Sequence, residues 1–279
     1  MDFGERALDA VRRAGPLVFG LDPSREVLES WGISDAPDGL DRFVDIALDA
    51  CIGSVGMVKP QSAFYERHGW RGIRSLARLV RSAREGGLLV ILDAKRGDVG
   101  STMKAYGEAY LGESAALRVD AVTATPYLGF DTIRPWFDLA AESSACVFVV
   151  TRSSNPEGRS IQGARHADGR SVEGRILGQI AMENERLSPG RLGPVGAVFG
   201  PTHGTPLFDL RSVNGLFLAP GVGAQGATPK DVARCFAACP DRVLASSSRG
   251  LLREGPDVRA LRAAAERLAT ELRDLSVGG

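Results

Sequence analysis

The segment Leu88-Leu89-Val90-Ile91-Leu92-Asp93-Ala94-Lys95-Arg96-Gly97-Asp98 joins a short apolar run directly to a charged cluster. A run of branched apolar residues that ends in polar ones is typical of a strand buried on both faces. Side chains alternate along a strand, so we expect Asp93 and Lys95 to point the same way. Gly97 is expected to let the chain turn and bring Asp98 back toward them. The segment therefore favours an active site, with a salt-bridged strand end as the alternative.

Apolar runs of this kind recur eight times and alternate with longer amphipathic stretches. The alternation continues without a linker or a break in composition, so we expect repeated β-α units in a single domain over residues 1–279. Eight strands in 279 residues favour an α/β fold of the (β/α)8 TIM barrel type, with an open doubly wound sheet as the alternative. The predicted strands are Leu17 to Leu21, Ser54 to Val58, Leu88 to Leu92, Ala121 to Ala124, Ala145 to Val150, Val195 to Phe199, Gly215 to Leu218 and Val243 to Ala245. The predicted helices include Leu40 to Cys51, Gly72 to Glu85, Val172 to Leu187, Asp231 to Ala238 and Asp257 to Leu275.

The composition argues against several classes of protein. Lys and Arg together number 34, as do Asp and Glu, and the sequence has no concentrated basic block, which argues against a nucleic-acid-binding surface. No apolar stretch approaches the roughly 20 residues that cross a bilayer, and Met1 to Arg6 lack the order of a signal peptide. The four cysteines are scattered, and Cys235 and Cys239 have no nearby histidine to complete a zinc set. We therefore expect reduced cysteines and a cytoplasmic protein without nucleic-acid or membrane partners.

Polar or glycine-rich residues follow each predicted strand. The loops after the strands of a (β/α)8 barrel build its site, so these residues are expected to share one rim. Charged residues end three consecutive strands, namely Asp22, Lys59, and Asp93 with Lys95. A solvated rim leaves open the simpler alternative that Asp22 and Lys59 only pair with each other.

The segments after the last two predicted strands have the composition of a phosphate site. Gly221, Gly223 and Gly226 permit close approach of backbone N–H groups. Gln225 can donate through its amide, and Arg249 offers a fork of donors that fits phosphate oxygens. Phosphate commonly binds at this position in barrels of this kind. The alternatives are a flexible turn for the glycines and a salt bridge for Arg249.

The motif Asp93-Ala-Lys95-Arg-Gly-Asp98-Val99-Gly100-Ser101-Thr102, together with Asp22, Lys59, Gln225 and Arg249, closely resembles the orotidine 5'-phosphate decarboxylase family. The resemblance extends from Gly20 to Gly250 and is similar to the longer-chain bacterial branch of that family. It implies decarboxylation of orotidine 5'-monophosphate to uridine 5'-monophosphate in de novo pyrimidine synthesis. It also implies a (β/α)8 homodimer that uses no cofactor and no metal.

Carried over by position, the resemblance implies a role for each matching residue. Lys95 is the proton donor to C6 of the pyrimidine, and Asp93 is the carboxylate beside the leaving carboxylate of the substrate. Lys59 and Asp98 extend this chain of charges.

The resemblance also implies the groups that bind the rest of the nucleotide. Asp22 and Lys59 hold ribose hydroxyls, Ser153 holds the pyrimidine, and Gln225 and Arg249 hold the phosphate. A one-residue slip near Arg152 leaves Ser154 as the alternative to Ser153. In the family, the last acid of the motif, the apolar residue after it and the threonine reach into the neighbouring subunit's site. Here those residues are Asp98, Val99 and Thr102.

Three other functions stay open from the residues. The first is a magnesium-dependent sugar-phosphate lyase or aldolase on a related barrel, and the second is a Schiff-base enzyme that uses Lys59 or Lys95. The third is a non-catalytic nucleotide-binding protein. The polar segment from Asn155 to Gly174 exceeds a usual strand-to-helix loop, and its role as a lid, a subunit contact or a disordered stretch is left unassigned.

Overall fold

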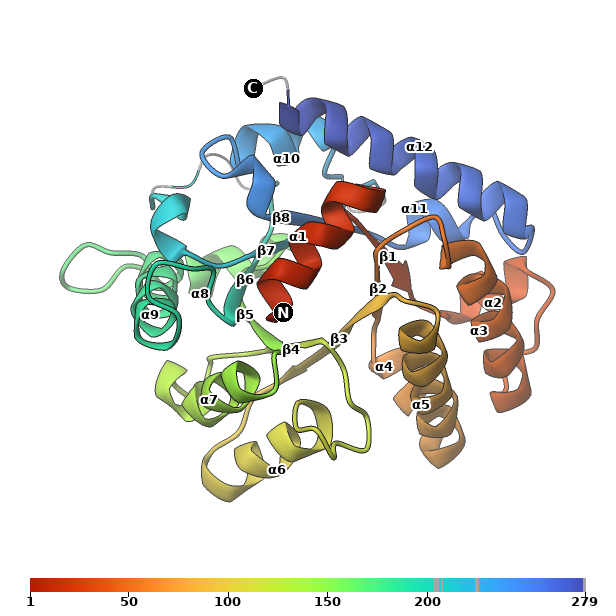
Figure 1. Ribbon diagram of the computed structural model, residues 1–279, viewed down its shortest axis with the longest axis horizontal. Coiled ribbons are helices and arrows are strands. Elements are labelled where there is room, and N and C mark those ends of the chain that lie inside the picture. The colour runs from red at the N-terminus through yellow and green to blue at the C-terminus, as the bar shows by residue number, and fades with distance from the viewer. Residues whose placement is uncertain (203–205, 207, 224–225, 278–279) are drawn as a thin grey trace.

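The computed structural model describes residues 1–202, 206, 208–223 and 226–277, and these residues form a closed barrel of eight parallel strands in sequence order (Figure 1). The barrel confirms the predicted (β/α)8 fold and excludes the open doubly wound sheet. The strands are β1 Leu17–Leu21, β2 Met57–Pro60, β3 Leu89–Arg96, β4 Ala121–Ala124, β5 Cys146–Arg152, β6 Val195–Phe199, β7 Phe217–Ala219 and β8 Val243–Ser247.

Helices surround the strands and lie between most consecutive ones, whereas the element described between β6 and β7 is a 3-10 turn (Figure 1). The longer helices are α1 Phe3–Ala14, α3 Pro37–Cys51, α5 Gly69–Glu85, α6 Gly100–Tyr110, α7 Arg134–Glu142, α9 Val172–Leu187 and α12 Val258–Val277. The shorter ones are α2 Arg25–Ser30, α4 Ala63–Glu66, α8 Arg159–Gln162, α10 Pro229–Cys235 and α11 Arg249–Leu252. Short 3-10 turns lie at Phe130–Ile133, Pro156–Gly158, Leu210–Val213 and Pro240–Arg242.

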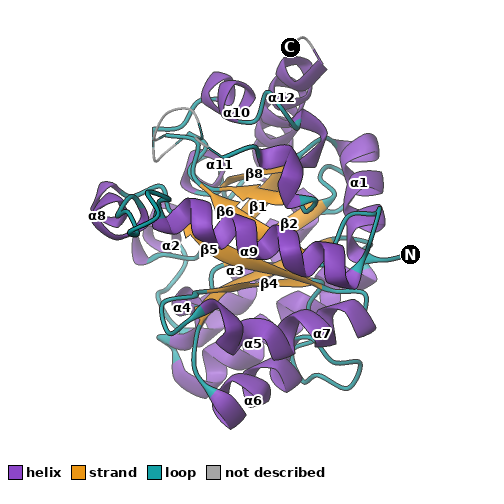
Figure 2. Ribbon diagram, turned by 90° about the vertical axis from the view of Figure 1, so that its left-hand side faces the viewer, coloured by secondary structure: helices purple, strands orange, loops and turns teal. Residues whose placement is uncertain are grey.

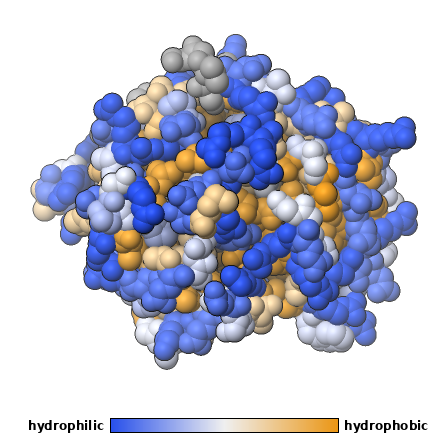
Figure 3. Space-filling view, in the orientation of Figure 1, coloured by the Kyte–Doolittle hydropathy of each residue, from blue (hydrophilic) through white to orange (hydrophobic). Residues whose placement is uncertain are grey.

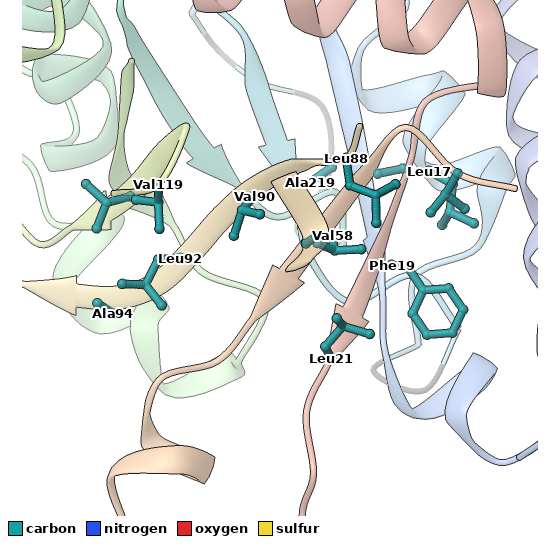
Figure 4. Close-up of a cluster of buried hydrophobic side chains, with 14 of the residues drawn as sticks. Leu17, Phe19, Leu21, Val58, Leu88, Val90, Leu92, Ala94, Val119 and Ala219 are labelled. Atoms are coloured by element: carbon teal, nitrogen blue, oxygen red, sulfur yellow. The ribbon is translucent and has the colours of Figure 1, made fainter. Parts of the chain in front are cut away.

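The strands separate two apolar clusters because their side chains alternate between the helices and the barrel interior. Figure 4 shows Leu17, Phe19 and Leu21 along one side of β1, and all three belong to the cluster that packs against the helices. The smaller cluster fills the barrel interior and includes Val18 and Ile91. On β3, the order Ile91, Asp93, Lys95 therefore follows the interior-facing side of the strand.

Helix α1 closes the end of the barrel where the strands begin. It lies across the strands in Figure 1, and Figure 2 shows it at the opposite end of the barrel from α8. Phe3, Ala7 and Ala10 join the interior cluster. Asp2 and Glu5 form a capping box at the start of the helix, and this pattern is the sequence signal by which α1, which was not predicted, could have been found. Helix α1 therefore covers the end of the barrel that lies opposite the carboxyl ends of the strands.

Several predicted boundaries differ from the observed ones. β2 begins at Met57 instead of Ser54, because the backbone N–H groups of Ser54 and Val55 bond to the carbonyl of Cys51 and extend the end of α3. β3 continues to Arg96 instead of ending at Leu92, so the charged cluster lies on the strand itself.

Hydrophilic residues dominate the face in Figure 3, and apolar residues show mainly in the furrows around α1. Cys51, Cys146, Cys235 and Cys239 are all described, and each is buried and free. Among the described residues, no helix combines the length and apolar character needed to cross a membrane. Both α1 and α12 pack on the barrel, which supports the proposal of one domain over residues 1–279.

A buried ion pair fastens α1 to the barrel. The Arg6 guanidinium lies 2.6 Å from the Asp120 carboxylate at the start of β4, and Arg6 also donates to the carbonyl of Ser144. The second oxygen of Asp120 accepts the backbone N–H of Val90 at 2.9 Å. Asp120 is only 3% exposed, so loss of its carboxylate would leave a buried donor without a partner.

We expect Asp120→Ala to lower the free energy of unfolding by about 1–3 kcal/mol, because Arg6 and the Val90 N–H both lose their acceptor. The matched control is Asp9→Ala on α1, where an exposed carboxylate pairs with Arg12 and Arg13. Exposed pairs within one helix contribute little, so the control should change stability by less than about 0.5 kcal/mol. Urea unfolding followed by circular dichroism measures both values, and equal effects would contradict the role of the buried pair.

Candidate active site

A pocket of about 600 Å³ opens at the carboxyl ends of the strands. Its floor is the last inward-facing layer of the barrel, and its walls are the loops that follow β1, β2, β5, β7 and β8. The predicted site residues that line it are Asp22, Lys59, Asp93, Lys95, Ser153 and Arg249, together with the alternative Ser154. These residues from separate strands therefore share one cavity.

The carboxylate of Asp93 is the centre of the charges in the pocket. The Lys95 ammonium lies 2.6 Å from its Oδ1, and the Lys59 ammonium lies 3.1 Å from its Oδ2. Two neutral donors complete its contacts, with Thr123 Oγ1 2.9 Å from Oδ1 and Gln61 Nε2 3.3 Å from Oδ2. One buried anion is thus held between two cations.

Burial and neighbouring charges shift the pKa values of Asp93 and Lys59 in opposite directions. Burial would by itself raise the pKa of Asp93, but the charges of Lys59 and Lys95 outweigh it and hold that pKa well below its usual range. Burial would lower the pKa of Lys59, yet the carboxylates of Asp93 and Asp22 outweigh it and raise that pKa. Asp93 and Lys59 are therefore both ionised at neutral pH.

The two lysines differ in their access to the pocket. The Lys59 side chain is 8% exposed, whereas the Lys95 side chain is 46% exposed. Lys95 has a φ angle of 46°, in the left-handed region that residues other than glycine rarely adopt. The exposed Lys95 ammonium therefore reaches the open cavity and also contacts Asp93.

Asp22 lies beside this chain of charges without a direct ion pair to Lys59. Its Oδ1 accepts the backbone N–H of Gln61 at 3.2 Å, while Lys59 pairs with Asp93. The alternative of an isolated pair between Asp22 and Lys59 is therefore wrong.

Ser153 is held by the long segment after β5. Its backbone N–H donates to Gln162 Oε1 at 3.0 Å, and its hydroxyl accepts from Gln162 Nε2 at 2.9 Å. Gln162 ends α8, so part of the segment from 155 to 174 is a helical turn that contacts the pocket wall. Ser154 also lines the pocket, so the geometry keeps both serines as candidates.

The structure describes most of the residues that were predicted to bind phosphate. Arg249 begins α11, lines the pocket and is exposed, and no described residue forms an ion pair with it. The predicted salt-bridge alternative for Arg249 is therefore not observed. Gly221, Gly223 and Gly226 all have positive φ angles, as a tight turn of the backbone requires. Gln225 lies outside the described residues.

Asp98, Val99 and Thr102 do not line the pocket that the described residues of one chain form. The Asp98 carboxylate instead accepts the N–H of Val99 at 2.8 Å. The expectation that Gly97 returns Asp98 to Lys95 within the chain is wrong. Gly97 has no positive φ angle, and a side chain there would collide with Thr125 at 2.6 Å. The glycine therefore serves close packing against the loop after β4.

Two residues that contact Asp93 had no predicted role. Gln61 and Thr123 both stand where a predicted strand ends, and that position was the available signal. Their contacts depend on the register between neighbouring strands, which the sequence does not show. Within the described residues, no group of three or more His, Cys, Asp or Glu side chains is arranged to hold a metal ion.

Comparison with known proteins identifies the family of this chain. A family model described as "Orotidine 5'-phosphate decarboxylase / HUMPS family" matches residues 15–264. An orotidine 5'-phosphate decarboxylase from Streptomyces coelicolor is 49% identical over 272 residues, which cover 97% of each chain. Another from Salinispora arenicola is 47% identical over 276 residues, which cover 99% of each chain.

Solved structures agree with these relatives. The crystal structure of a candidate orotidine 5'-phosphate decarboxylase from Streptomyces avermitilis is 48% identical, with a TM-score of 0.94, and the match covers 99% of this chain and 96% of that one. The structure of Leishmania donovani OMP decarboxylase is 25% identical, with a TM-score of 0.77, over the whole of both chains. The family match and the relatives over nearly the full length show that this chain belongs to the orotidine 5'-phosphate decarboxylase / HUMPS family.

Proposed function

We propose that this protein decarboxylates orotidine 5'-monophosphate to uridine 5'-monophosphate and CO2, as a step of pyrimidine nucleotide synthesis. The observation that carries the proposal is the order Lys59, Asp93, Lys95 at the mouth of a barrel whose relatives are named for this reaction. One cation of the three-residue set reaches the open cavity, which is the arrangement that protonation of a carbanion requires.

The chemistry explains why a fixed ammonium is useful. Loss of CO2 from C6 leaves an electron pair in an orbital that the pyrimidine ring cannot readily delocalise. The Lys95 ammonium would stabilise the charge that develops at C6 and then transfer a proton to it, which yields uridine 5'-monophosphate and a neutral amine. A proton from solvent would restore the ammonium. The contact with Asp93 at 2.6 Å would hold the ammonium in place before the reaction begins.

Asp93 would lie beside the carboxylate that leaves. Repulsion between the two anions would be relieved as neutral CO2 departs. The fixed ammonium ions would supply the larger share of the rate, because their positions are set before the reaction and need little rearrangement. Lys59 would keep Asp93 ionised from the buried side.

The other pocket residues would bind the rest of the nucleotide. Asp22 and Lys59 would hold ribose hydroxyls, and Ser153 would hold the pyrimidine. Gln225 and Arg249 would hold the phosphate, and the exposed guanidinium of Arg249 supports this assignment. Phosphate binding would also close the loop around Gly221 to Gly226 and exclude water from the charges.

We further propose a homodimer in which Asp98, Val99 and Thr102 complete the partner's site. These residues do not line the pocket of their own chain as described. Val99 is 53% exposed, and Tyr127 and Leu128 in the loop after the neighbouring strand β4 are 78% and 53% exposed. Exposed apolar side chains on adjacent loops favour an interface with a second copy.

A cytoplasmic location stays a prediction. Four free cysteines are compatible with a reducing compartment.

We expect the protein to convert orotidine 5'-monophosphate at its full rate after treatment with EDTA, because the ammonium groups provide the positive charge at C6. Spectrophotometric turnover by metal-stripped protein, with the untreated protein as control, measures this. Loss of activity that added Mg²⁺ restores would instead support a magnesium-dependent lyase. Binding of uridine 5'-monophosphate without release of CO2 would support a non-catalytic nucleotide-binding protein.

We expect Lys95→Ala to lower kcat by at least about 10³-fold with the fold intact, because the proton donor and the nearest cation are both lost. Arg249→Ala should mainly raise KM, because its guanidinium is remote from the reacting carbon. Matched controls are Lys104→Ala and Arg253→Ala, which remove exposed cations that do not line the pocket. Steady-state kinetics with circular dichroism measures all four variants. Near-wild-type kcat in Lys95→Ala would overturn the catalytic assignment.

We expect a mixture of inactive Asp98→Ala and Lys95→Ala chains to regain part of the activity. One of the two sites in each hybrid dimer would receive an intact Lys95 from one chain and an intact Asp98 from the other. Mass spectrometry verifies subunit exchange, and each variant alone serves as the control. Absence of regained activity after verified exchange would contradict the contribution in trans.

A further inference from the structure

The pairing of β3 with β4 is irregular at the catalytic segment. Leu92 pairs with Val122 and Arg96 pairs with Ala124, so Asp93, Ala94 and Lys95 all stand opposite the single residue Thr123. The two extra residues cannot stay in a regular ladder, and β3 bulges. Lys95 takes up part of this bulge with its left-handed backbone, which is strained for a residue other than glycine.

The hydroxyl of Thr123 bridges the two ends of this bulge. It accepts the backbone N–H of Lys95 at 2.9 Å and donates its own proton to Asp93 Oδ1 at 2.9 Å. The Lys95 ammonium contacts the same oxygen of Asp93 at 2.6 Å. Backbone N–H, hydroxyl, carboxylate and ammonium therefore form one closed ring through Lys95, Thr123 and Asp93.

A hydroxyl is the group that this ring requires. It can accept one hydrogen bond and donate another at the same time, whereas a methyl group does neither. Thr123 is 1% exposed, so water cannot easily replace the lost contacts. The inward direction of Thr123 also places it in the floor of the pocket, beside the carboxylate that separates the two lysines.

We propose that Thr123 is a positioning residue, whose hydroxyl holds the backbone of Lys95 and the carboxylate of Asp93 so that the Lys95 ammonium reaches C6 of the substrate. This role rests on the proposed decarboxylation. Thr123 acts through Lys95 and Asp93, so its loss should affect kcat far more than KM. A displacement of about 1 Å in a catalytic group can lower a rate by about 10²-fold.

Substitution at this position separates the hydroxyl from the shape of the side chain. Thr123→Val keeps the branched shape and removes the hydroxyl, Thr123→Ala removes both, and Thr123→Ser keeps the hydroxyl. We expect kcat to fall about 10- to 100-fold in the valine and alanine variants, with KM changed by less than about threefold. The serine variant should keep kcat within about threefold of wild type. If the valine variant does not fold, the alanine variant is compared with the serine variant instead.

The matched control is Thr151→Val. Thr151 is equally buried on β5, and its hydroxyl donates to the carbonyl of Val149, but it does not line the pocket. Wild-type kcat is expected in this control. Thermal unfolding of each variant verifies the fold.

A second measurement does not depend on turnover. Thr123 accepts the Lys95 N–H, so hydrogen exchange of that amide should accelerate about tenfold or more in the valine variant and stay slow in the serine variant. If wild-type protein releases no CO2 from orotidine 5'-monophosphate, the proposed function fails. The difference in amide exchange between the valine and serine variants still tests whether Thr123 holds the Lys95 backbone. Unchanged exchange, wild-type kcat in the valine variant, or equal losses in the serine and valine variants would each overturn the role of Thr123.

Discussion

The carboxylate of Asp93 is the constraint on which the arrangement of the site depends. A buried carboxylate is unfavourable unless charges and hydrogen bonds replace its water, and here two ammonium groups and two neutral donors do so. Each donor comes from a different place, with Lys59 on β2, Gln61 after it, Lys95 on β3 and Thr123 on β4. Three adjacent strands must therefore keep their register for one anion to stay satisfied.

The interior of the barrel has two parts. Near the start of the strands, the inward side chains are apolar and pack against α1, so this end is filled by the core. At the other end, the inward positions include Lys59, Asp93, Thr123 and Ser246, and they form the floor of the pocket. The same alternation of side chains that builds the core thus directs the charges to a single opening.

In the proposed homodimer, each chain would supply only part of a binding site. The motif that begins on β3 divides into Asp93 and Lys95, which face the pocket, and Asp98, Val99 and Thr102, which do not line it. If the second group completes the partner's site, as proposed, catalysis would require the assembled dimer. The exposed apolar residues Val99, Tyr127 and Leu128 lie on loops after β3 and β4, at the rim of the pocket.

The sequence by itself determined the class of fold and the kinds of chemical group in the site, because both follow from local order. Eight apolar runs with polar ends predict the barrel, and alternation along one strand places Asp93 and Lys95 on the same side. Only the tertiary structure decided which groups meet across strands. Thr123 is 30 residues from Asp93 and Gln61 is 32, and their contacts arise from strand register and from the bulge in β3. The position of Asp98 was likewise decided by packing, since Gly97 fits closely against Thr125 instead of turning the chain back. Register and bulges depend on the fit of whole strands and loops to one another, and no local pattern of residues specifies that fit.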